Sequence, residues 1–196
     1  MSSGASQLSS LAQAPLAGPD RRTEVLTTAL LTFARFGYRK TSMDDIAKAA
    51  RISRPGLYFL FTSKEELFRE AASRALEDDV ADAESILADS TRPLDDRVLD
   101  AFDRWAGRYV GPMAADISIV IADNPGLMGD LAESAPRHFA HLVTDAIAHS
   151  SKKSQRDNAA SIAQTLISTS VGIKHQASDR VDYRARLRVA IGLLLG

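Results

Sequence analysis

The sequence contains no cysteine. It therefore has neither a disulfide framework nor a thiolate metal site, and nothing in it points to an oxidising compartment. The longest apolar runs, residues 117–122 and 189–195, are far shorter than the roughly 20 residues that a membrane span requires. Residues 1–19 contain no Lys or Arg and so lack the basic region of a secretion signal. These absences predict a cytoplasmic protein with no membrane contact, and we interpret residues 1–19 as a disordered N-terminal arm.

Short signatures of catalysis are missing as well. Ser, His and Asp all occur, but there is no Gly-x-Ser-x-Gly elbow, no Gly-rich phosphate loop and no His-Glu-x-x-His pair. We therefore expect neither an enzyme nor a bound cofactor or metal.

One set of candidate metal ligands falls on a single face of a predicted helix, at spacings compatible with metal ligation: His138, His141, Asp145 and His149. The opposite face of the same helix is apolar. This arrangement is typical of an amphipathic helix with a solvated polar face, and we favour that interpretation over a metal site.

Charge is unevenly distributed along the chain, although the net charge is only −1. Residues 21–64 contain nine basic and three acidic side chains, whereas residues 65–196 contain fifteen basic and twenty-one acidic ones. A short basic segment followed by an acidic body favours local contact with a polyanion.

A helical repeat runs through almost every segment after residue 20, which predicts an all-α fold of about nine helices. Four helix starts crowd into about forty-five residues, with N-caps expected at Asp20, Ser42, Ser53 and Ser63. Gly37 is expected to end the first helix. Farther on, helices are predicted over about 91–109, 126–150, 157–177 and 180–195, with a polar surface loop at 150–157. We divide the chain into two domains, a basic one at 20–66 and a larger, acidic one at 67–196.

Two short helices joined by a tight turn, buttressed by neighbouring helices, describe a helix-turn-helix, whose second helix enters the major groove of DNA. The second helix has two distinct faces. Helical spacing places Leu57, Leu60 and Phe61 together toward the core, and Tyr58 and Phe59 on the opposite side. Large aromatic side chains exposed on such a short helix favour contact with bases and sugars.

Individual side chains of this segment match known DNA contacts. Arg54 can hydrogen-bond a guanine edge, and Pro55 and Phe59 can contact thymine methyl groups. Gly56 has no side chain to hold the helix away from the groove, and the hydroxyl of Tyr58 can reach a phosphate.

The helix starts offer further phosphate contacts. Thr41 or Ser42 can present a hydroxyl together with free backbone N–H groups. Lys64 places a cation in the first turn of a helix, where the helix dipole disfavours it, so a phosphate partner would explain its position.

A dense pattern runs through this region and consists of Phe33-Ala34-Arg35-Phe36-Gly37-Tyr38, Thr41-Ser42-Met43-Asp44-Asp45-Ile46-Ala47-Lys48-Ala49-Ala50, Ile52-Ser53-Arg54, Leu57-Tyr58, Phe61 and Ser63-Lys64-Glu65-Glu66-Leu67-Phe68. With these residues the sequence resembles the DNA-binding domain of the TetR family, over about a quarter of the chain. It implies a dimer joined through the last two helices, operator binding relieved by a small molecule, and usually repression. By position, it assigns DNA contact to Thr41, Ser42, Ser53, Arg54, Gly56, Tyr58 and Lys64.

Arg51 departs from the family pattern, which commonly has glycine in this turn. The position often requires a left-handed backbone, which costs a non-glycine residue about 1 kcal/mol. A cation beside DNA is not harmful, so Arg51 is included among the expected DNA-binding residues.

The second domain is expected to hold an effector in an apolar pocket lined by Phe102, Trp105, Tyr109, Met113, Ile117, Met128 and Phe139. For any one of these residues, a place in an ordinary hydrophobic core is an equally good interpretation. Trp105 and Tyr109 favour the pocket, since they share a helix face and each has a polar tip that can orient a ligand.

The last two helices contain more apolar residues than one helix pair needs to bury within a monomer. A two-fold four-helix interface would cover the excess, and we expect it to include Ile162, Leu166, Val171, Leu187, Ile191 and Leu194. Such a dimer would separate its recognition helices by roughly 34 Å, which matches successive major grooves.

The sequence thus predicts a dimeric, effector-responsive regulator of transcription that binds double-stranded palindromic DNA. In the expected mechanism, a small apolar or amphipathic effector near Trp105 shifts the fourth helix and changes the separation of the recognition helices. Two alternatives remain open: a helical adaptor that has lost DNA binding, and a plain helical domain whose basic residues are only a solvated face.

Overall fold

The computed structural model describes residues 19–111, 120, 125–150 and 152–196. Over these residues all regular structure is helical, which confirms the all-α class, and nine α-helices and two short 3₁₀ helices are present. In chain order they are α1 (Pro19–Phe36), α2 (Met43–Ala49), α3 (Arg54–Leu60), α4 (Lys64–Ala88), α5 (Leu94–Trp105), η1 (Gly107–Tyr109), η2 (Pro125–Leu127), α7 (Leu131–Ala148), α8 (Lys153–Asp157), α9 (Ala159–Gln176) and α10 (Arg180–Leu195).

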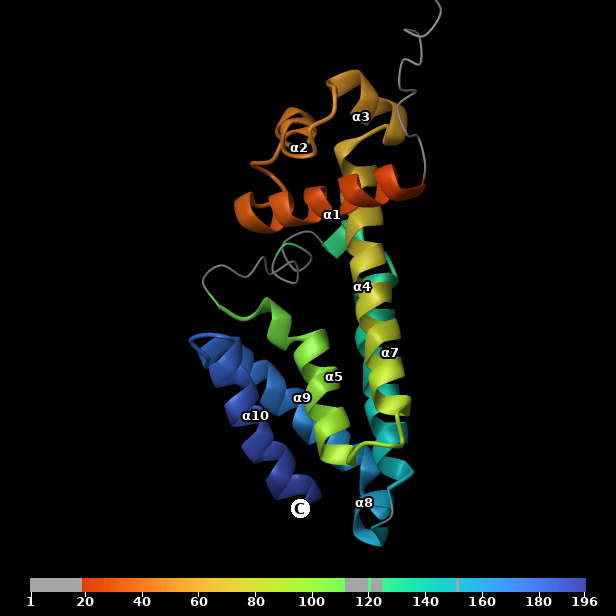
Figure 1. Ribbon diagram of the computed structural model, residues 1–196, viewed down its shortest axis with the longest axis vertical. Helices are drawn as coiled ribbons and strands as arrows, with labels where there is room; N and C mark the ends of the chain where they lie inside the picture. Colours follow the sequence, from red (N-terminus) through yellow and green to blue (C-terminus); the bar gives the residue numbers. More distant parts are fainter. Residues whose placement is uncertain (1–18, 112–119, 121–124, 151) are drawn as a thin grey trace, which may run out of the picture.

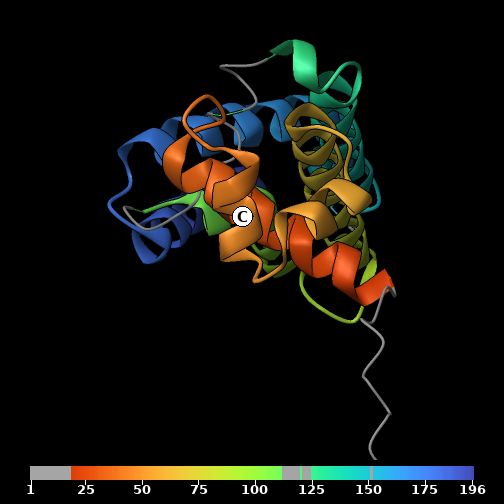
Figure 2. The ribbon, with the colours of Figure 1, turned by 90° about the horizontal axis from the view of Figure 1, so that it is seen from above.

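Helix α4 is the long axis of the molecule (Figure 1). Helices α1, α2 and α3 form a small group at its N-terminal end, with α1 lying across it. Helices α5, α9 and α10 pack together at the other end, and α7 runs beside α4, as Figure 2 also shows. Helix α4 therefore belongs to both groups, since its first half packs with α1–α3 and its second half packs with the helices at the other end.

Two separate hydrophobic cores lie along α4. One core joins α1, α2 and α3 to the N-terminal half of α4, including Leu67 and Phe68, and we call it the upper core. The other joins α5, α7, α9 and α10 to Ala83 and Leu87 of α4, and we call it the lower core. The predicted domain boundary at residue 66 falls in the first turn of α4, and the helix continues without a break across the junction of the cores.

The expected caps explain why the short helices begin where they do. The Ser42 hydroxyl accepts the backbone N–H of Asp45, and the Asp45 carboxylate accepts the backbone N–H of Ser42, so this capping box is confirmed. The Ser53 hydroxyl accepts the backbone N–H of Gly56 at the start of α3, and the Ser63 hydroxyl accepts the backbone N–H of Glu66 at the start of α4. Gly37 follows α1 with a φ of +81°, a conformation open to glycine at little cost.

The prediction of a surface loop at 150–157 was wrong, because α8 occupies most of it. Gln155 of α8 is buried and donates to the carbonyl of Leu195, and the Lys152 ammonium donates to the carbonyls of Leu195 and Gly196. This polar segment therefore caps the C-terminal end of α10, a long-range contact that its composition does not reveal.

Two other helix limits differ from the prediction. The helix expected over 91–109 ends at Trp105 and continues as η1. The break lies at Ala106, the C-cap of α5, and at the next residue, Gly107, a Cβ atom would come within 2.9 Å of the Tyr183 ring. The helix expected from residue 126 begins at Leu131, after η2. Over the described residues, none of these helices has the length and apolarity needed to cross a membrane.

Candidate nucleic-acid interface

The turn between α2 and α3 has the left-handed conformation expected at Arg51, whose φ is +53°. The backbone N–H of Ile52 donates to the carbonyl of Ala47 at 3.0 Å, which closes the turn. From α1, the guanidinium of Arg21 donates to the carbonyls of Ala50 and Arg51, each at 3.1 Å. A non-glycine residue is thus held in a strained region by a side chain from another helix, and the Arg51 side chain itself remains exposed.

Helix α3 has one buried and one exposed face, as its spacing predicted. Leu57 is completely buried, and so is Phe61 at its C-cap. Tyr58 and Phe59 are exposed, Phe59 at 84% of its surface. Leaving an aromatic side chain so open to water forgoes the gain from burying its apolar area, about 25 cal/mol per Å². The exposed face of α3 is therefore suited to contact with another molecule.

Arg54 is positioned at the start of this exposed face. Its Nε lies 3.2 Å from an Oδ of Asp44 in α2, and its guanidinium carbon lies 5.7 Å from the centre of the Tyr58 ring. The Arg54 side chain is still 62% exposed, so the ion pair orients the guanidinium without covering it. An exposed pair of this kind adds little stability, and a base edge can compete with it.

Pro55 and Gly56 lie in the first turn of α3, where the missing N–H of proline has no helical partner to lose. The N–H of Gly56 donates to the Ser53 hydroxyl at 3.1 Å, and a Cβ atom at Gly56 would lie 3.0 Å from that oxygen. Gly56 therefore allows close capping by Ser53, in addition to the close approach to DNA expected from its sequence position.

Thr41 and Ser42, which lie just before α2, differ in their exposure. Thr41 is buried and its hydroxyl donates to the carbonyl of Gly37 at 2.8 Å. Ser42 is exposed, and its hydroxyl donates to the Asp45 carboxylate at 2.6 Å. These Ser42 bonds lower the pKa of Asp45. Of the two hydroxyls considered for a phosphate contact, only that of Ser42 lies at the surface.

Lys64 has partners within the chain. Its ammonium donates to the carbonyls of Tyr38 and Thr41, each at 3.1 Å, and lies 4.4 Å from the centre of the Tyr38 ring. The cation therefore ties the segment between α1 and α2 to the first turn of α4. These two carbonyls explain why a cation lies at the positive end of the α4 dipole. The phosphate partner that the sequence suggested for Lys64 is not needed to explain its position.

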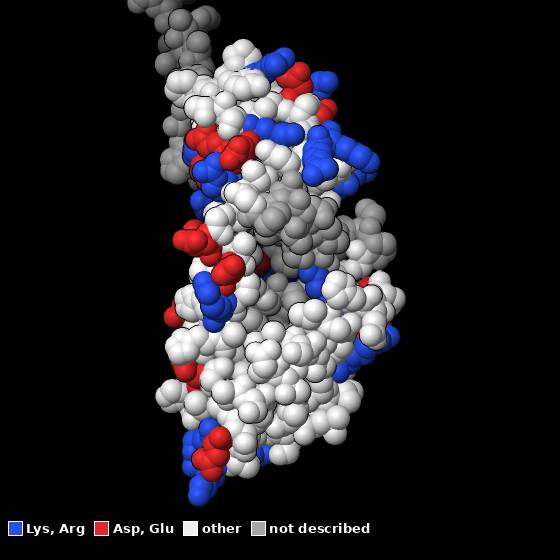
Figure 3. Space-filling view, turned by 180° about the vertical axis from the view of Figure 1, so that it is seen from behind, with Lys and Arg blue, Asp and Glu red and all other residues white. Residues whose placement is uncertain are grey.

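Five basic side chains in this region have no ion-pair partner in the described part of the chain: Arg35, Arg39, Lys40, Lys48 and Arg51. Blue side chains gather at the α1–α3 end of the face in Figure 3. Elsewhere most arginines are paired with carboxylates, so the positive charge left uncompensated is concentrated in the helix-turn-helix. This distribution is typical of a surface that meets a polyanion.

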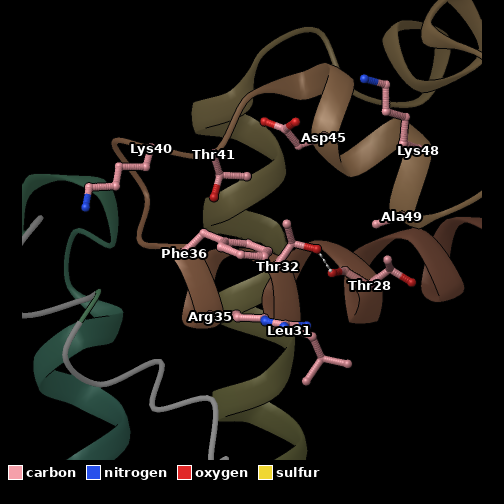
Figure 4. Close-up of a pocket in the computed structure, with 10 residues that line it drawn as sticks. All are labelled: Thr28, Leu31, Thr32, Arg35, Phe36, Lys40, Thr41, Asp45, Lys48 and Ala49. Atoms are coloured by element: carbon pink, nitrogen blue, oxygen red, sulfur yellow. Dashed lines mark hydrogen bonds between the residues drawn. The ribbon is translucent and has the colours of Figure 1, made fainter.

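A groove of about 740 Å³ lies between α1 and α2 within this basic region (Figure 4). Thr32, Phe36 and Thr41 lie along its centre, and Lys40 and Lys48 lie at opposite margins. The cations do not converge on one point. We therefore regard the groove as part of the basic surface rather than as a closed ligand pocket.

The residues expected to line an effector pocket are divided between the two cores. Phe102, Trp105 and Phe139 are together in the lower core, where the Trp105 ring stacks on Phe139 with centroids 4.9 Å apart and an angle of 9°. Tyr109 and Met128 pack in the upper core instead. The remaining two, Met113 and Ile117, lie outside the described residues.

Asp79 joins these two groups, and the sequence reasoning missed it. It is 1% exposed, accepts a hydrogen bond from the Tyr109 hydroxyl at 2.6 Å, and pairs with Arg104 and Arg108. Burial raises the pKa of Asp79 to about 6, against the lowering effects of the Tyr109 hydrogen bond and the Arg104 charge. The sequence signal was an acid on the side of the fourth helix that packs inward.

The expected dimer residues are mostly inside the single chain. Leu166, Leu187 and Ile191 are buried in the lower core, and Ile162 and Leu194 are partly buried against it. Val171 is the exposed member of the set. Three further exposed valine and leucine residues lie on α10: Val181, Val189 and Leu193.

The His face of α7 is exposed, as expected for a solvated face. His141 lies 3.3 Å from the Asp145 carboxylate, and a ring nitrogen of His149 lies 2.7 Å from the Asp145 carbonyl. No three His, Asp or Glu side chains within the described ranges are placed to hold a metal ion.

Comparison with known proteins identifies the helix-turn-helix region. The model of a family described as bacterial regulatory proteins, tetR family, matches residues 25–71. An uncharacterised transcriptional regulator of Bacillus subtilis, YhgD, is 39% identical over 59 residues, which are 30% of this chain and 31% of the relative. The probable acrEF/envCD operon repressor of Escherichia coli K12 is 43% identical over 49 residues, 25% of this chain and 22% of the relative. The matches thus span less than a third of these relatives.

Longer matches are more distant. The nicotine-responsive transcriptional repressor HdnoR of Paenarthrobacter nicotinovorans is 26% identical over 155 residues, covering 76% of this chain and 78% of the relative. A putative transcriptional regulator of Saccharomonospora viridis, solved with choline, has a TM-score of 0.70 at 18% identity and covers 89% of this chain and 97% of its own. A tetR-family regulator of Streptomyces coelicolor has a TM-score of 0.67 at 20% identity, over 92% and 82%. These structures share the fold.

Proposed function

Because the chain belongs to the TetR family of bacterial regulatory proteins, we propose that it regulates transcription by inserting α3 into the major groove of an operator. The observation that carries the proposal is the exposed face of α3, where Arg54, Tyr58 and Phe59 face solvent. Membership in a family of regulatory proteins, rather than of enzymes, agrees with the lack of catalytic motifs. A regulator of this kind acts on DNA in the cytoplasm.

In this proposal Arg54 reads a guanine edge, and Phe59 and Pro55 contact thymine methyl groups. Tyr58, Ser42 and Arg51 supply phosphate contacts, joined by the unpaired cations around α1 and α2. Lys64 acts indirectly, since its bonds to the Tyr38 and Thr41 carbonyls hold the start of α2 in place.

We propose a two-fold dimer through the exposed faces of α9 and α10. Val171, Val181, Val189 and Leu193 supply its apolar contacts, because Leu166, Leu187 and Ile191 are already covered within one chain. Gly192 lies exposed on α10 with open space around it, which allows a second helix to approach closely. A dimer of this kind would read two half-sites of a palindrome.

An effector is proposed to bind in the larger group of helices near Trp105 and to lower the affinity for DNA, so that the protein acts as a repressor. The relative HdnoR is described as nicotine-responsive, and the S. viridis regulator was solved with choline. Both names support a small molecule as the effector class. Here its binding would be transmitted through α4, which is common to both cores.

Selection of bound sequences from random duplexes tests the proposal. We expect a discrete palindrome, bound with an affinity that falls steeply as salt increases. Arg54→Ala should weaken binding and broaden the selected sequence. Arg69→Ala is a matched control, since Arg69 is an exposed arginine on α4 whose one ion pair among the described residues is with Glu65. If no sequence is enriched, the chain is better described as a helical adaptor that has lost DNA binding.

A further inference from the structure

Asp79 lies where the two cores meet on α4. Leu67, Phe68 and Ala72 of the same helix belong to the upper core, and Ala83 and Leu87 belong to the lower core. Burying a carboxylate between two apolar stretches of one helix is costly unless the carboxylate is paired with groups that it holds in position.

All three partners of Asp79 come from one short segment, residues 104–109. Arg108 donates to Asp79 at 2.7 Å and Tyr109 at 2.6 Å, and Arg104 pairs with Asp79 while also reaching Asp82 at 2.5 Å. One acid on α4 is thus attached at three points to the end of α5 and to η1.

This segment also contacts both cores through its aromatic side chains. The Trp105 ring stacks on Phe139 in the lower core, and the Tyr109 ring packs in the upper core. A molecule that displaced Trp105 would therefore pull on the residues that hold Asp79. Trp105 is the single tryptophan of the chain.

The other side of α4 has room to accommodate a shift. A groove of about 360 Å³ runs between α4 and α7 at the same level, lined by Leu76, Val80 and Ala81 on α4 and by Ser134 and Ala135 on α7. Helix α4 is therefore held firmly on one side by Asp79 and packed less fully on the other.

Stability alone does not explain the Asp79 cluster. Burial raises the pKa of Asp79 even though two guanidinium groups are in contact with it, so its charged form is disfavoured inside the protein. The other charged groups close to it are Asp78 and Asp82 on α4 and Lys174 of α9, whose ammonium lies 5.7 Å from the Tyr109 ring centre. Buried ionic clusters are weak contributors to stability and can instead specify one packing arrangement.

We propose that Asp79 is a positioning residue, which sets the placement of α4 and of the α1–α3 group against the α5–η1 segment and transmits effector binding to the DNA-binding helices. The transmission part rests on the proposed function. The positioning part concerns the chain alone and can be tested without DNA.

The test uses the absence of native cysteine, which allows two spin labels to be placed at Ala49→Cys in α2 and Asp95→Cys in α5. Both positions are exposed. The doubly labelled chain is diluted with an excess of unlabelled chain, so that pulsed electron spin resonance measures distances within one chain. We expect one narrow distance distribution in the parent protein, and a broader or doubled distribution in Asp79→Asn.

Asp103→Asn provides a matched control. Asp103 is also a buried carboxylate held by two arginines, Arg180 and Arg184, but it joins α5 to α10, and within the described residues no hydrogen bond or ion pair links it to α4. We expect Asp103→Asn to keep the narrow distribution. If Asp79→Asn also keeps it, or if both variants broaden it equally, Asp79 has no particular role in positioning α4.

A second measurement concerns the proposed function. Random duplexes containing two half-sites at varied spacing should yield one preferred spacing for the parent protein and several for Asp79→Asn, with operator affinity reduced by a factor of roughly 5–150, the usual range of allosteric coupling. If the parent protein selects no duplex, the proposed function fails, whereas the distance measurement still decides the positioning role. If distances broaden but spacing preference is unchanged, the transmission part is overturned.

Discussion

Asp103 of α5 and Arg180 of α10 are 77 positions apart in the sequence and share two hydrogen bonds, of 2.9 and 2.7 Å. They are one rung of a ladder, in which Asp100 pairs with Arg184 and Asp96 with Arg188. The carboxylates follow one another along α5 at helical spacing, and the arginines follow in reverse order along α10. The ladder therefore runs along the side of α10 that is turned toward α5.

Breaking this ladder should destabilise the chain. Asp103→Asn removes the buried carboxylate that accepts from Arg180 and Arg184, and we expect a loss of about 1–3 kcal/mol in the free energy of unfolding, measured in urea. Asp96→Asn removes an exposed pair and should cost less than about 1 kcal/mol. Similar losses for the two variants would contradict the importance assigned to burial.

The exposed face of α3 predicts a separation between stability and DNA binding. Phe59→Ala should leave the melting temperature unchanged, because the Phe59 ring makes so little contact with the rest of the chain. The same variant should weaken DNA binding in a fluorescence anisotropy titration by more than about 1 kcal/mol, as truncation of an important interface side chain does. Leu57→Ala, on the buried face of the same helix, should instead lower the stability by about 2–5 kcal/mol.

The dimer proposal depends on the exposed face of α10. Leu193→Arg should convert the dimer to a monomer, because a charge would be buried at the interface. Size-exclusion chromatography with light scattering measures this change. The single chain should stay folded, because Leu193 is exposed in it. Leu187 is also a leucine of α10, six positions earlier, but it is buried. Leu187→Ala should therefore cost about 2–5 kcal/mol of stability. A Leu193→Arg protein that remains dimeric would place the interface elsewhere.

The pH dependence of stability should reveal Asp79. Its pKa in the folded chain is about 6, above the ordinary 3.8. The folded chain therefore holds this proton more tightly, and the contribution of Asp79 to stability decreases as the pH rises from about 4 to 6. We expect Asp79→Asn to be more stable than the parent protein at pH 7.5, by up to about 3 kcal/mol, and the difference to shrink toward pH 4.

The measured quantity is the difference in the free energy of unfolding between Asp79→Asn and the parent protein. The contributions of acids that titrate elsewhere are the same in both proteins and cancel in this difference. A variant that is less stable than the parent at pH 7.5 would mean that the ion pairs outweigh the burial of the charge. A variant that is more stable, yet imprecise in its placement of α4, would indicate that the carboxylate is retained for positioning rather than for stability.

The strained turn makes a further prediction. Arg51 has a φ of +53°, which glycine adopts without strain. Arg51→Gly should raise the stability by up to about 1 kcal/mol, or roughly 2–4 °C in melting temperature for a chain of this size. Operator affinity should fall slightly, since one exposed cation is lost. An unchanged melting temperature would mean that the greater freedom of glycine in the unfolded chain offsets the relief of strain.

Much of the helix-turn-helix was predictable because its signals are local. Ser42, Ser53 and Ser63 cap the helices that begin beside them, and the exposure of Phe59 follows from its position relative to Leu57 and Phe61. A cap or a helical face is decided within about one turn of the chain, so neighbouring residues contain the information.

The roles of Thr41, Lys64 and Gln155 were not predictable in the same way. Each has a polar group whose partner is a backbone carbonyl, and those of Lys64 and Gln155 lie 23 or more residues away. Solvent, phosphate and carbonyl are all suitable partners for such groups, and composition does not distinguish among them.

The sequence by itself therefore determined where α2, α3 and α4 begin and which side chains α3 turns outward, since these depend on contacts along one stretch of chain. Only the tertiary structure decided that Leu187 is covered while Leu193 is exposed, and that Asp79 meets Arg108 and Tyr109 between two cores. Helical periodicity shows that a helix has an apolar stripe. Which neighbour covers that stripe, and which charge lies opposite a buried acid, depends on how helices distant in the sequence pack together.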